Sequence, residues 1–324
     1  MMMLEYLSQF LRCPDDGATL DPLAGCLACA LCRRRFPLED GNYVSMVSLQ
    51  PARLAEDTSY AAGYLAARAD DDPTALPSWS IAEESSGRLF EYKRRQVDQV
   101  QSLVSEDRPE LDLLCDFSAG PGYYTLEYAK RWRYVIHCDL CAGSIAYARR
   151  MARDARIGNI LFVRMDYLRP AFHQSAPRII CLDTLIRGRE HERALAGSIH
   201  QSLAPDGAAV IDFHNWWHNP LRRLGLLPEN FNHNRSYSLR ELAPLLAAAG
   251  ISRYETIPFH QELDPAGGLY SLLARLLPPT RWMYRVKSCY PAEFSSFTID
   301  TAKPAARTTL SDRKRISSSQ GATR

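Results

Sequence analysis

Short apolar runs alternate with stretches of helical periodicity from residue 111 onward, and this alternation limits the possible folds more than any other feature. Five apolar runs have the length of strands: Leu111–Phe117, Tyr134–Cys141, Ile160–Tyr167, Ile179–Leu185 and Ala208–His214. The stretches between and after them have helical spacing: Tyr123–Arg131, Ser144–Ala155, His191–Ala204 and Leu239–Ala249. Strands that alternate with helices predict an α/β fold, with a mostly parallel sheet covered by helices on both faces.

Two later segments complete the predicted sheet. Arg253–Phe259 and Trp282–Tyr290 are further strand candidates, so we expect a Rossmann-like sheet of seven strands. By composition the chain divides into a cysteine-rich module at 1–48, a helical segment at 49–108, the α/β domain at 109–300 and a tail at 301–324. The tail is basic and has few large apolar residues, so we expect it to be disordered.

Charge and apolar content exclude several classes of protein. The net charge is +2 and the tail contributes +5, so the rest of the chain is slightly acidic. It therefore lacks the basic footprint of a nucleic-acid-binding protein. No apolar run reaches the length of about 18 residues that a transmembrane helix needs, and Met1–Arg12 lacks the features of a signal peptide. We therefore expect a cytoplasmic protein.

Four of the nine cysteines lie close together near the start of the chain: Cys13, Cys26, Cys29 and Cys32. An odd total without a signal peptide argues against a disulfide framework. Two thiolates three residues apart in a tight turn converge on one tetrahedral ion, and zinc is the usual ion in such a site. The cluster therefore predicts a zinc site on these four cysteines.

The same segment resembles the short zinc-ribbon module found in front of many bacterial methyltransferases, with matches at Cys13, Cys29, Cys32, Phe36 and Pro37. Position 16, where that module has its second ligand, is an aspartate. Either Asp16 or the additional Cys26 completes the site. Two other interpretations stay open: a module that has lost its metal, and an iron–sulfur cluster on the four cysteines.

The first predicted strand ends in a glycine-rich turn that opens a helix, with the sequence LLCDFSAGPGYYTLEYAKR. Gly120 and Gly122 let the backbone approach a ligand closely, where a side chain would block it. The dinucleotide-binding pattern requires a third glycine three residues later, where this chain has Thr125. The turn predicts a nucleotide-like ligand but departs from the dinucleotide pattern.

The turn resembles motif I of class I S-adenosylmethionine-dependent methyltransferases, in which an acidic residue precedes alternating glycines. Asp116 is the acidic residue, and Ser118 stands where the family has its first glycine. Serine is tolerated there if the position has an ordinary φ. The second strand ends in Asp139, nineteen residues after Gly120, where the family has the carboxylate that binds the ribose hydroxyls.

Further matches follow in chain order. The third strand ends in Asp166-Tyr167, where the family places the acidic residue that binds the adenine amino group. The segments DLCAGSIAYARRMA, IICLDTLIRG and SLAPDGAAVI resemble the next helix, the active-site strand and the turn into strand five. The resemblance implies S-adenosylmethionine as the cofactor, bound by Asp116, Ser118, Gly120, Gly122, Asp139, Leu140, Asp166, Tyr167 and Asp183.

Candidates for the acceptor side follow the fourth strand and end the fifth. Methyl transfer needs an aligned nucleophile and, for a hydroxyl acceptor, a base. His214 could be the base, Arg187 could hold an anionic group of the acceptor, and His191 lies shortly after Arg187. Each also has a structural interpretation: His214 bonded to backbone, Arg187 in a surface ion pair, and His191 opening its helix.

These observations predict a methyltransferase that acts on a small molecule in a biosynthetic pathway, with oxygen favoured over nitrogen or carbon as the acceptor. Neither Asn-Pro-Pro-aromatic nor Asp-Pro-Pro-aromatic follows the fourth strand, which disfavours methylation of base and amide nitrogens. Two alternatives remain: a non-catalytic scaffold that kept the fold, and an RNA methyltransferase whose ribbon docks on RNA through Arg33, Arg34 and Arg35.

Overall fold

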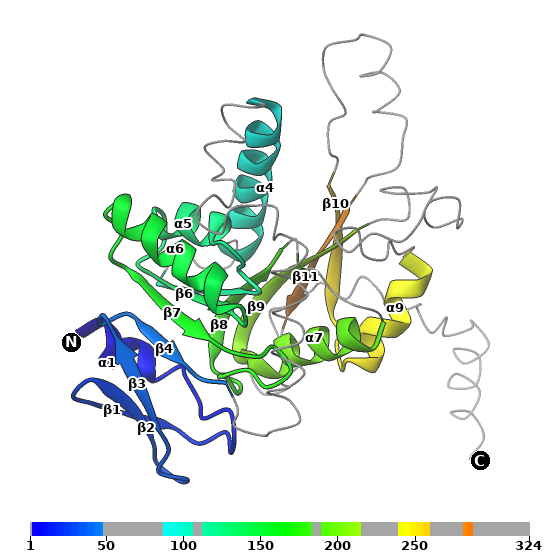
Figure 1. Ribbon diagram of the computed structural model, residues 1–324. Helices are drawn as coiled ribbons and strands as arrows, with labels where there is room; N and C mark the ends of the chain where they lie inside the picture. Colours follow the sequence, from blue (N-terminus) through cyan, green and yellow to red (C-terminus); the bar gives the residue numbers. More distant parts are fainter. Residues whose placement is uncertain are drawn as a thin grey trace, which may run out of the picture.

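One mixed sheet runs through the computed structural model, which describes residues 2–47, 87–105, 112–182, 184, 189–214, 239–259 and 281–287 (Figure 1). Its strands are β1 (Leu20–Leu23), β2 (Cys26–Cys29), β3 (Arg35–Glu39), β4 (Tyr43–Ser45), β5 (Leu113–Phe117), β6 (Tyr134–Asp139), β7 (Ile160–Arg164), β8 (Ala176–Cys181), β9 (Leu203–His214), β10 (Tyr254–Phe259) and β11 (Arg281–Lys287). The helices are α1 (Met2–Ser8), α4 (Gly87–Ser105), α5 (Tyr123–Ala129), α6 (Ala142–Asp154), α7 (Arg189–Ser202) and α9 (Leu239–Ala248). No helix in these ranges is long and apolar enough to cross a membrane.

Seven of the strands form the sheet that the apolar runs predict. Strands β7, β6, β5, β8 and β9 lie side by side and are parallel. Strand β11 then pairs antiparallel with both β9 and β10. The predicted α/β fold with a seven-stranded, mostly parallel sheet is therefore confirmed, and every predicted strand is present with small differences at its ends.

The position of β5 at the centre of the sheet explains why its sequence is a continuous apolar run. All five of its residues are buried, because β6 and β8 cover its two edges and helices cover its two faces. From β5 the chain adds β6 and β7 on one side, then returns to add β8 and β9 on the other. Ligands of such sheets bind where the direction of winding reverses, at the carboxyl ends of the central strands.

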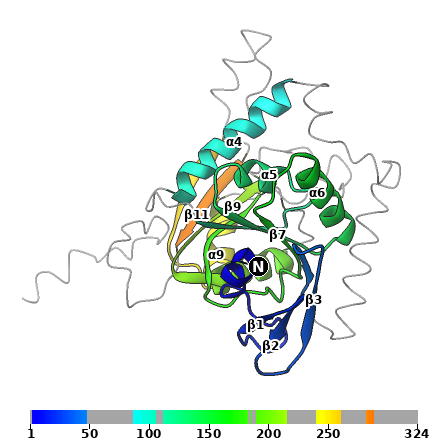
Figure 2. The same cartoon turned by 90° about the vertical axis from the view of Figure 1, so that its left-hand side faces the viewer.

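Helices cover both faces of this sheet (Figures 1 and 2). One apolar core contains side chains of α4, α5 and α6 packed against the strands, with Val100, Tyr128 and Ala148 fully buried. A second core lies on the opposite face and contains side chains of α1, α7 and α9, among them Leu7, Ile199 and Leu246. Strand β5 thus lies between the two cores, with β6 and β8 on its edges, and its carboxyl end leads through the Gly120–Gly122 turn into α5.

The cysteine-rich module continues the main sheet. Strand β4 pairs parallel with β7, and β3 joins β4 to β2 and β1. Two backbone bonds of 2.8 Å extend the contact beyond the paired residues: Phe162 N–H to the carbonyl of Asn42, and Met46 N–H to the carbonyl of Arg164. Ser175 also donates to the carbonyl of Phe10 at 2.6 Å. The module thus covers the edge of β7. Of the helical segment predicted at 49–108, for which the family resemblance implies a lid or linker, residues 87–105 form α4 and the remainder lies outside the described residues, as does the tail at 301–324.

Gly122 lies where α5 and α6 approach each other most closely. Its φ is +85°, and a Cβ atom placed on it would lie 2.7 Å from the Cβ of Ala148. Gly120, in the same turn, has a φ of +54°, and nothing lies within 4 Å of the position of its Cβ. The two glycines therefore meet the same backbone requirement, but only Gly122 meets a packing requirement too.

We expect Gly122→Ala to lower the free energy of unfolding by about 2–5 kcal/mol, because it adds a clash of about 1–3 kcal/mol to left-handed strain of about 1–2 kcal/mol. The control Gly120→Ala carries only the strain. Denaturant unfolding of both variants, read by circular dichroism, measures the difference. Equal losses of stability in the two variants would show that the helices do not meet at Gly122.

Candidate functional site

The turn after β5 is bonded to the end of β6, and this contact defines the candidate site. The Ala119 N–H donates to the carbonyl of Cys138 at 3.0 Å, and the Gly120 N–H donates to Oδ2 of Asp139 at 2.7 Å. The second carboxylate oxygen of Asp139 accepts the Cys141 N–H at 2.7 Å. The carboxylate is thus held between two turns, at the reversal of winding in the sheet.

Asp139 keeps the capacity to bind a ligand. Each carboxylate oxygen has two lone pairs, and the Gly120 and Cys141 N–H groups each take one lone pair on a different oxygen. Desolvation raises the pKa of Asp139, and the N–H bonds from Cys141 and Gly120 oppose that rise. The residue is only half-buried, so its free lone pairs can accept two adjacent hydroxyl groups.

Asp166 follows β7, the next strand outward. Its side chain is buried, and its Oδ1 accepts the Leu168 N–H at 2.8 Å. The turns after β6 and β7 are joined by two bonds of 2.9 Å: the Met165 N–H donates to the carbonyl of Asp139, and Nε of Arg164 donates to the carbonyl of Leu140. The structure therefore brings Asp139, Leu140, Asp166 and the half-buried Tyr167 to the same edge of the sheet.

Ser118 has a φ of +55°, in the left-handed region. The sequence-based expectation that serine is tolerated there required an ordinary φ, and the structure corrects it. A glycine would adopt this conformation without strain, whereas a serine there costs about 1–2 kcal/mol. The turn therefore keeps the backbone conformation of a glycine-rich loop at a residue that is not glycine.

A buried chain of hydrogen bonds lies beneath the turn. The Thr125 hydroxyl donates to Oδ2 of Asp116 at 2.6 Å and lies 2.9 Å from Nδ1 of His137. Nε2 of His137 has no hydrogen-bond partner among the described residues.

Burial favours the neutral forms of Asp116 and His137, the two residues that Thr125 joins. Desolvation raises the pKa of Asp116 to about 7, against the opposing bond from Thr125. Desolvation lowers the pKa of His137 to about 3. Sequence reasoning selected Asp116 and missed His137, because a histidine inside an apolar strand gives no local signal. Thr125 was noticed only as the missing third glycine.

A second buried polar group was missed entirely. Gln96 of α4 accepts the Tyr124 hydroxyl at 2.6 Å and donates to Oδ2 of Asp212 at 3.3 Å. Asp212 lies on β9 and is 7% exposed, while Gln96 is fully buried. These contacts tie α4 and α5 to β9 near its carboxyl end. Their only sequence signal is a polar residue within an apolar strand.

The acceptor-side candidates are placed only in part. His214 ends β9 and His191 belongs to α7, and β9 lies beside β8 in the sheet. Asp183 and Arg187 lie outside the described residues. The structure thus places the backbone of both histidines and leaves the roles of all four residues as predictions.

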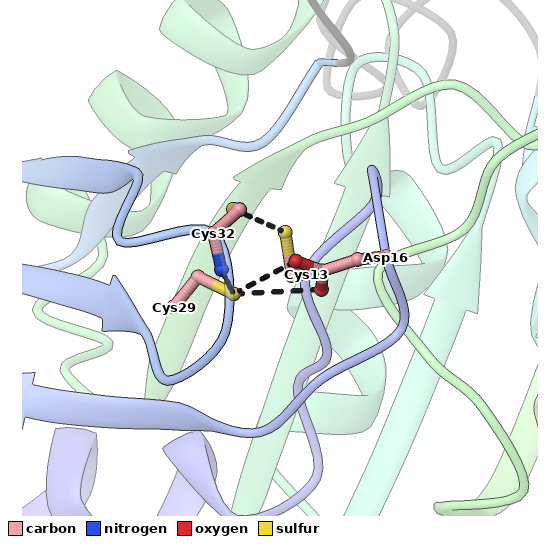
Figure 3. Close-up of side chains that lie close together, drawn as sticks. All are labelled: Cys13, Asp16, Cys29 and Cys32. Carbon is pink, nitrogen blue, oxygen red and sulfur yellow. Dashed lines mark hydrogen bonds between the residues drawn. The ribbon is translucent and has the colours of Figure 1, made fainter.

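The cysteine cluster contains three of the four predicted residues. Cys13, Cys29 and Cys32 lie together with Asp16, and their ligand atoms are all within 4.8 Å of one another (Figure 3). Cys26 opens β2 while Cys29 closes it, so three residues of extended strand separate them by about 10 Å. The structure therefore places Asp16, the alternative left open by the sequence, beside the three cysteines and Cys26 at the far end of β2, and the ligand set stays a prediction.

We expect Ser118→Gly to raise the free energy of unfolding by about 0.5–1 kcal/mol, since relief of left-handed strain exceeds the added entropy of the unfolded chain. Ser118→Ala retains the strain and serves as the control. Thermal unfolding of the three proteins measures the effect. A Ser118→Gly variant that is less stable than the wild type would mean that the serine side chain stabilises the turn.

We expect Thr125→Val to destabilise the protein by about 1–3 kcal/mol, because it leaves Asp116 and His137 buried without their shared partner. The loss should be larger at pH 8.5 than at pH 5.5. A raised pKa means that the Asp116 contribution is present at acid pH and is lost as the pH rises through about 7. Losing the Thr125 bond raises this pKa further, which penalises the ionised form.

Denaturant unfolding at the two pH values measures this difference, with Thr125→Ser as the control that keeps the hydroxyl. A loss that does not depend on pH would show that Asp116 is already ionised in the folded protein at pH 5.5.

Comparisons with known proteins find one matching family model and several similar solved structures. Residues 114–207 match the family model described as "Methyltransferase domain", and a comparison with curated proteins finds no relative. Similar solved structures include a geranyl diphosphate C-methyltransferase from Streptomyces coelicolor A3(2), at 14% identity over 60% of this chain and 75% of that chain, with a TM-score of 0.45.

Two others are an S-adenosylmethionine-dependent methyltransferase from Clostridium acetobutylicum ATCC 824, at 12% identity over 59% of this chain and 90% of that chain (TM-score 0.46), and the magnesium protoporphyrin IX methyltransferase from Synechocystis PCC 6803, at 19% identity over 61% and 83% (TM-score 0.44). The family match runs from β5 into β9 and spans most of the residues that form the candidate site. Residues 114–207 of this chain therefore match a methyltransferase domain.

Proposed function

We propose that the chain is an S-adenosylmethionine-dependent methyltransferase that acts on a small molecule. The observation that carries this proposal is the 2.7 Å bond from the Gly120 N–H to the carboxylate of Asp139. It holds a turn without bulky side chains beside an acidic residue, at the point where the sheet reverses its winding. The methyltransferase family match over the same residues supports the assignment.

The proposed cofactor site runs along the carboxyl ends of β5, β6 and β7. Asp139 accepts the two ribose hydroxyls with the lone pairs that Gly120 and Cys141 leave free. Asp166 binds the adenine amino group, and Leu140 and Tyr167 lie beside the ring. The turn from Ser118 to Gly122 lies along the methionine part, with Asp116 beneath it. Asp183, which lies outside the described residues, stays a further predicted cofactor-binding residue.

When bound, S-adenosylmethionine supplies an electrophilic methyl group on its sulfonium. The chain then has to hold the acceptor atom about 3–3.5 Å from that methyl and keep water away. We assign the acceptor to the carboxyl ends of β8 and β9, with His214 as the base for a hydroxyl acceptor, Arg187 holding an anionic group and His191 nearby. Oxygen remains the favoured acceptor, and we place the reaction in a cytoplasmic biosynthetic pathway.

We expect Asp139→Ala to weaken S-adenosylmethionine binding on the order of a hundredfold, because two charge-assisted hydrogen bonds to the ribose are lost. Asp139→Asn keeps the shape of the side chain but loses its charge, so it should also weaken binding. Isothermal titration calorimetry with S-adenosylmethionine and S-adenosylhomocysteine measures both. Asp21→Ala, which removes an exposed carboxylate on β1, is the matched control.

The wild-type titration separates the rival functions. Micromolar binding of both compounds supports the proposal, and unchanged binding in the Asp139 variants would remove the ribose assignment. Folded wild-type protein that binds neither compound would favour the non-catalytic scaffold. RNA that stays bound to the purified protein and competes with small-molecule acceptors for it would favour the RNA methyltransferase.

A further inference from the structure

The four ligand atoms of the cysteine cluster lie within 4.8 Å of one another, and two of their separations match those of a tetrahedral zinc site. Zinc–sulfur bonds of about 2.3 Å require sulfur atoms about 3.8 Å apart, and a carboxylate oxygen at about 2.0 Å from the ion lies about 3.5 Å from each sulfur. Sγ of Cys13 and Sγ of Cys32 are 3.7 Å apart. Sγ of Cys29 lies 3.2 and 3.4 Å from the two carboxylate oxygens of Asp16.

Backbone groups hold two of these ligands in place. The Leu31 and Cys32 N–H groups both point at Sγ of Cys29 from 3.3 Å, an arrangement that stabilises a negatively charged sulfur. The Ala18 N–H donates to Oδ1 of Asp16 at 2.9 Å and fixes the orientation of the carboxylate. Oδ2 of Asp16 therefore remains available for a metal ion.

Charge also suits a divalent cation at this position. Three thiolates and one carboxylate around Zn²⁺ carry a formal charge of −2, and three arginines follow Cys32 directly. One of them, Arg34, pairs with Asp15 and packs over the ring of Phe36 at 4.7 Å from its centroid.

The cluster joins the two halves of the module whose last strand covers the main sheet. Cys13 and Asp16 lie in the loop between α1 and β1, while Cys29 and Cys32 lie at the turn between β2 and β3. Strand β3 leads to β4, and β4 pairs with β7. The carbonyl of Asn42 accepts the Phe162 N–H at 2.8 Å, so an amide of β7 depends directly on the module.

We propose that Cys13, Asp16, Cys29 and Cys32 bind one zinc ion and that this ion holds the module against β7. The ion thereby supports β7 and its neighbour β6, whose carboxyl ends carry Asp166 and Asp139. The zinc site stands on the geometry alone. The benefit to Asp139 and Asp166 as ligand-binding residues rests on the proposed function. Without the ion, the two loops lose their common anchor and β7 loses its outer neighbour.

The ligand set is tested by zinc content and zinc affinity of the full chain. We expect about one zinc per chain by plasma mass spectrometry, retained in Cys26→Ser and weakened at least tenfold in Asp16→Ala in competition with a chromogenic chelator. Asp16→Cys, which restores four sulfur ligands, should bind at least as tightly as the wild type. Wild-type protein without metal, or loss of zinc in Cys26→Ser with retention in Asp16→Ala, would overturn the site.

The support of the sheet is tested by amide hydrogen exchange before and after chelation of zinc, followed by mass spectrometry. We expect exchange in β7, including the Phe162 amide, to become about tenfold faster or more. Amides of β8, which lies between β5 and β9, should change much less, and added zinc should restore the β7 rates. Unchanged β7 exchange after complete removal of zinc would overturn this part of the proposal.

This measurement needs no cofactor, so its result is separate from that of the proposed function. Protein that binds zinc and protects β7 but binds no S-adenosylmethionine would contradict only the proposed function. Protein that binds S-adenosylmethionine but holds no zinc would contradict only the metal site.

Discussion

The pairing of β5 on both of its edges is the interaction on which the rest of the structure depends. Strands β6 and β8 pair with the two edges of β5, and every residue of β5 is buried. The pairing therefore fixes the position at which the turn after β5 begins. The turn that follows is then fixed against the end of β6 by Gly120 and Asp139. The candidate site therefore results from the order of strands, and its residues lie at the ends of strands and in the turns that follow them.

Sequence patterns predicted this part of the molecule well for a physical reason. A parallel sheet buried on both faces requires continuous apolar runs, and the residue that ends each run lies at the same edge. Asp139 and Asp166 could be placed on that basis. The hydrogen bonds of Thr125 with Asp116 and His137 could not be, because they join residues of three elements whose packing sets the distances. The φ of Ser118 likewise depends on how the turn is held, not on the serine itself.

The cysteine-rich module shows the same division between local and tertiary information. Cys29 and Cys32 share one turn, so their spacing alone predicted that they converge. The choice between Asp16 and Cys26 needed the strand register, which places Cys26 opposite Leu23 and Cys29 opposite Leu20. The parallel pairing of β4 with β7 has no sequence signal, because a three-residue strand is too short to recognise. That pairing nevertheless makes the module part of the main sheet rather than a separate appendage.

The antiparallel strand β11 lies between β9 and β10, although it follows both of them in the chain. The sheet therefore cannot be completed in the order of synthesis. A ribosome-bound chain ending before residue 281 would have β9 and β10 separated by a gap one strand wide, with unpaired backbone groups on both sides. Assembly of this region must wait for β11 to emerge from the ribosome, and until then the exposed edges of β9 and β10 are targets for chaperones and for aggregation.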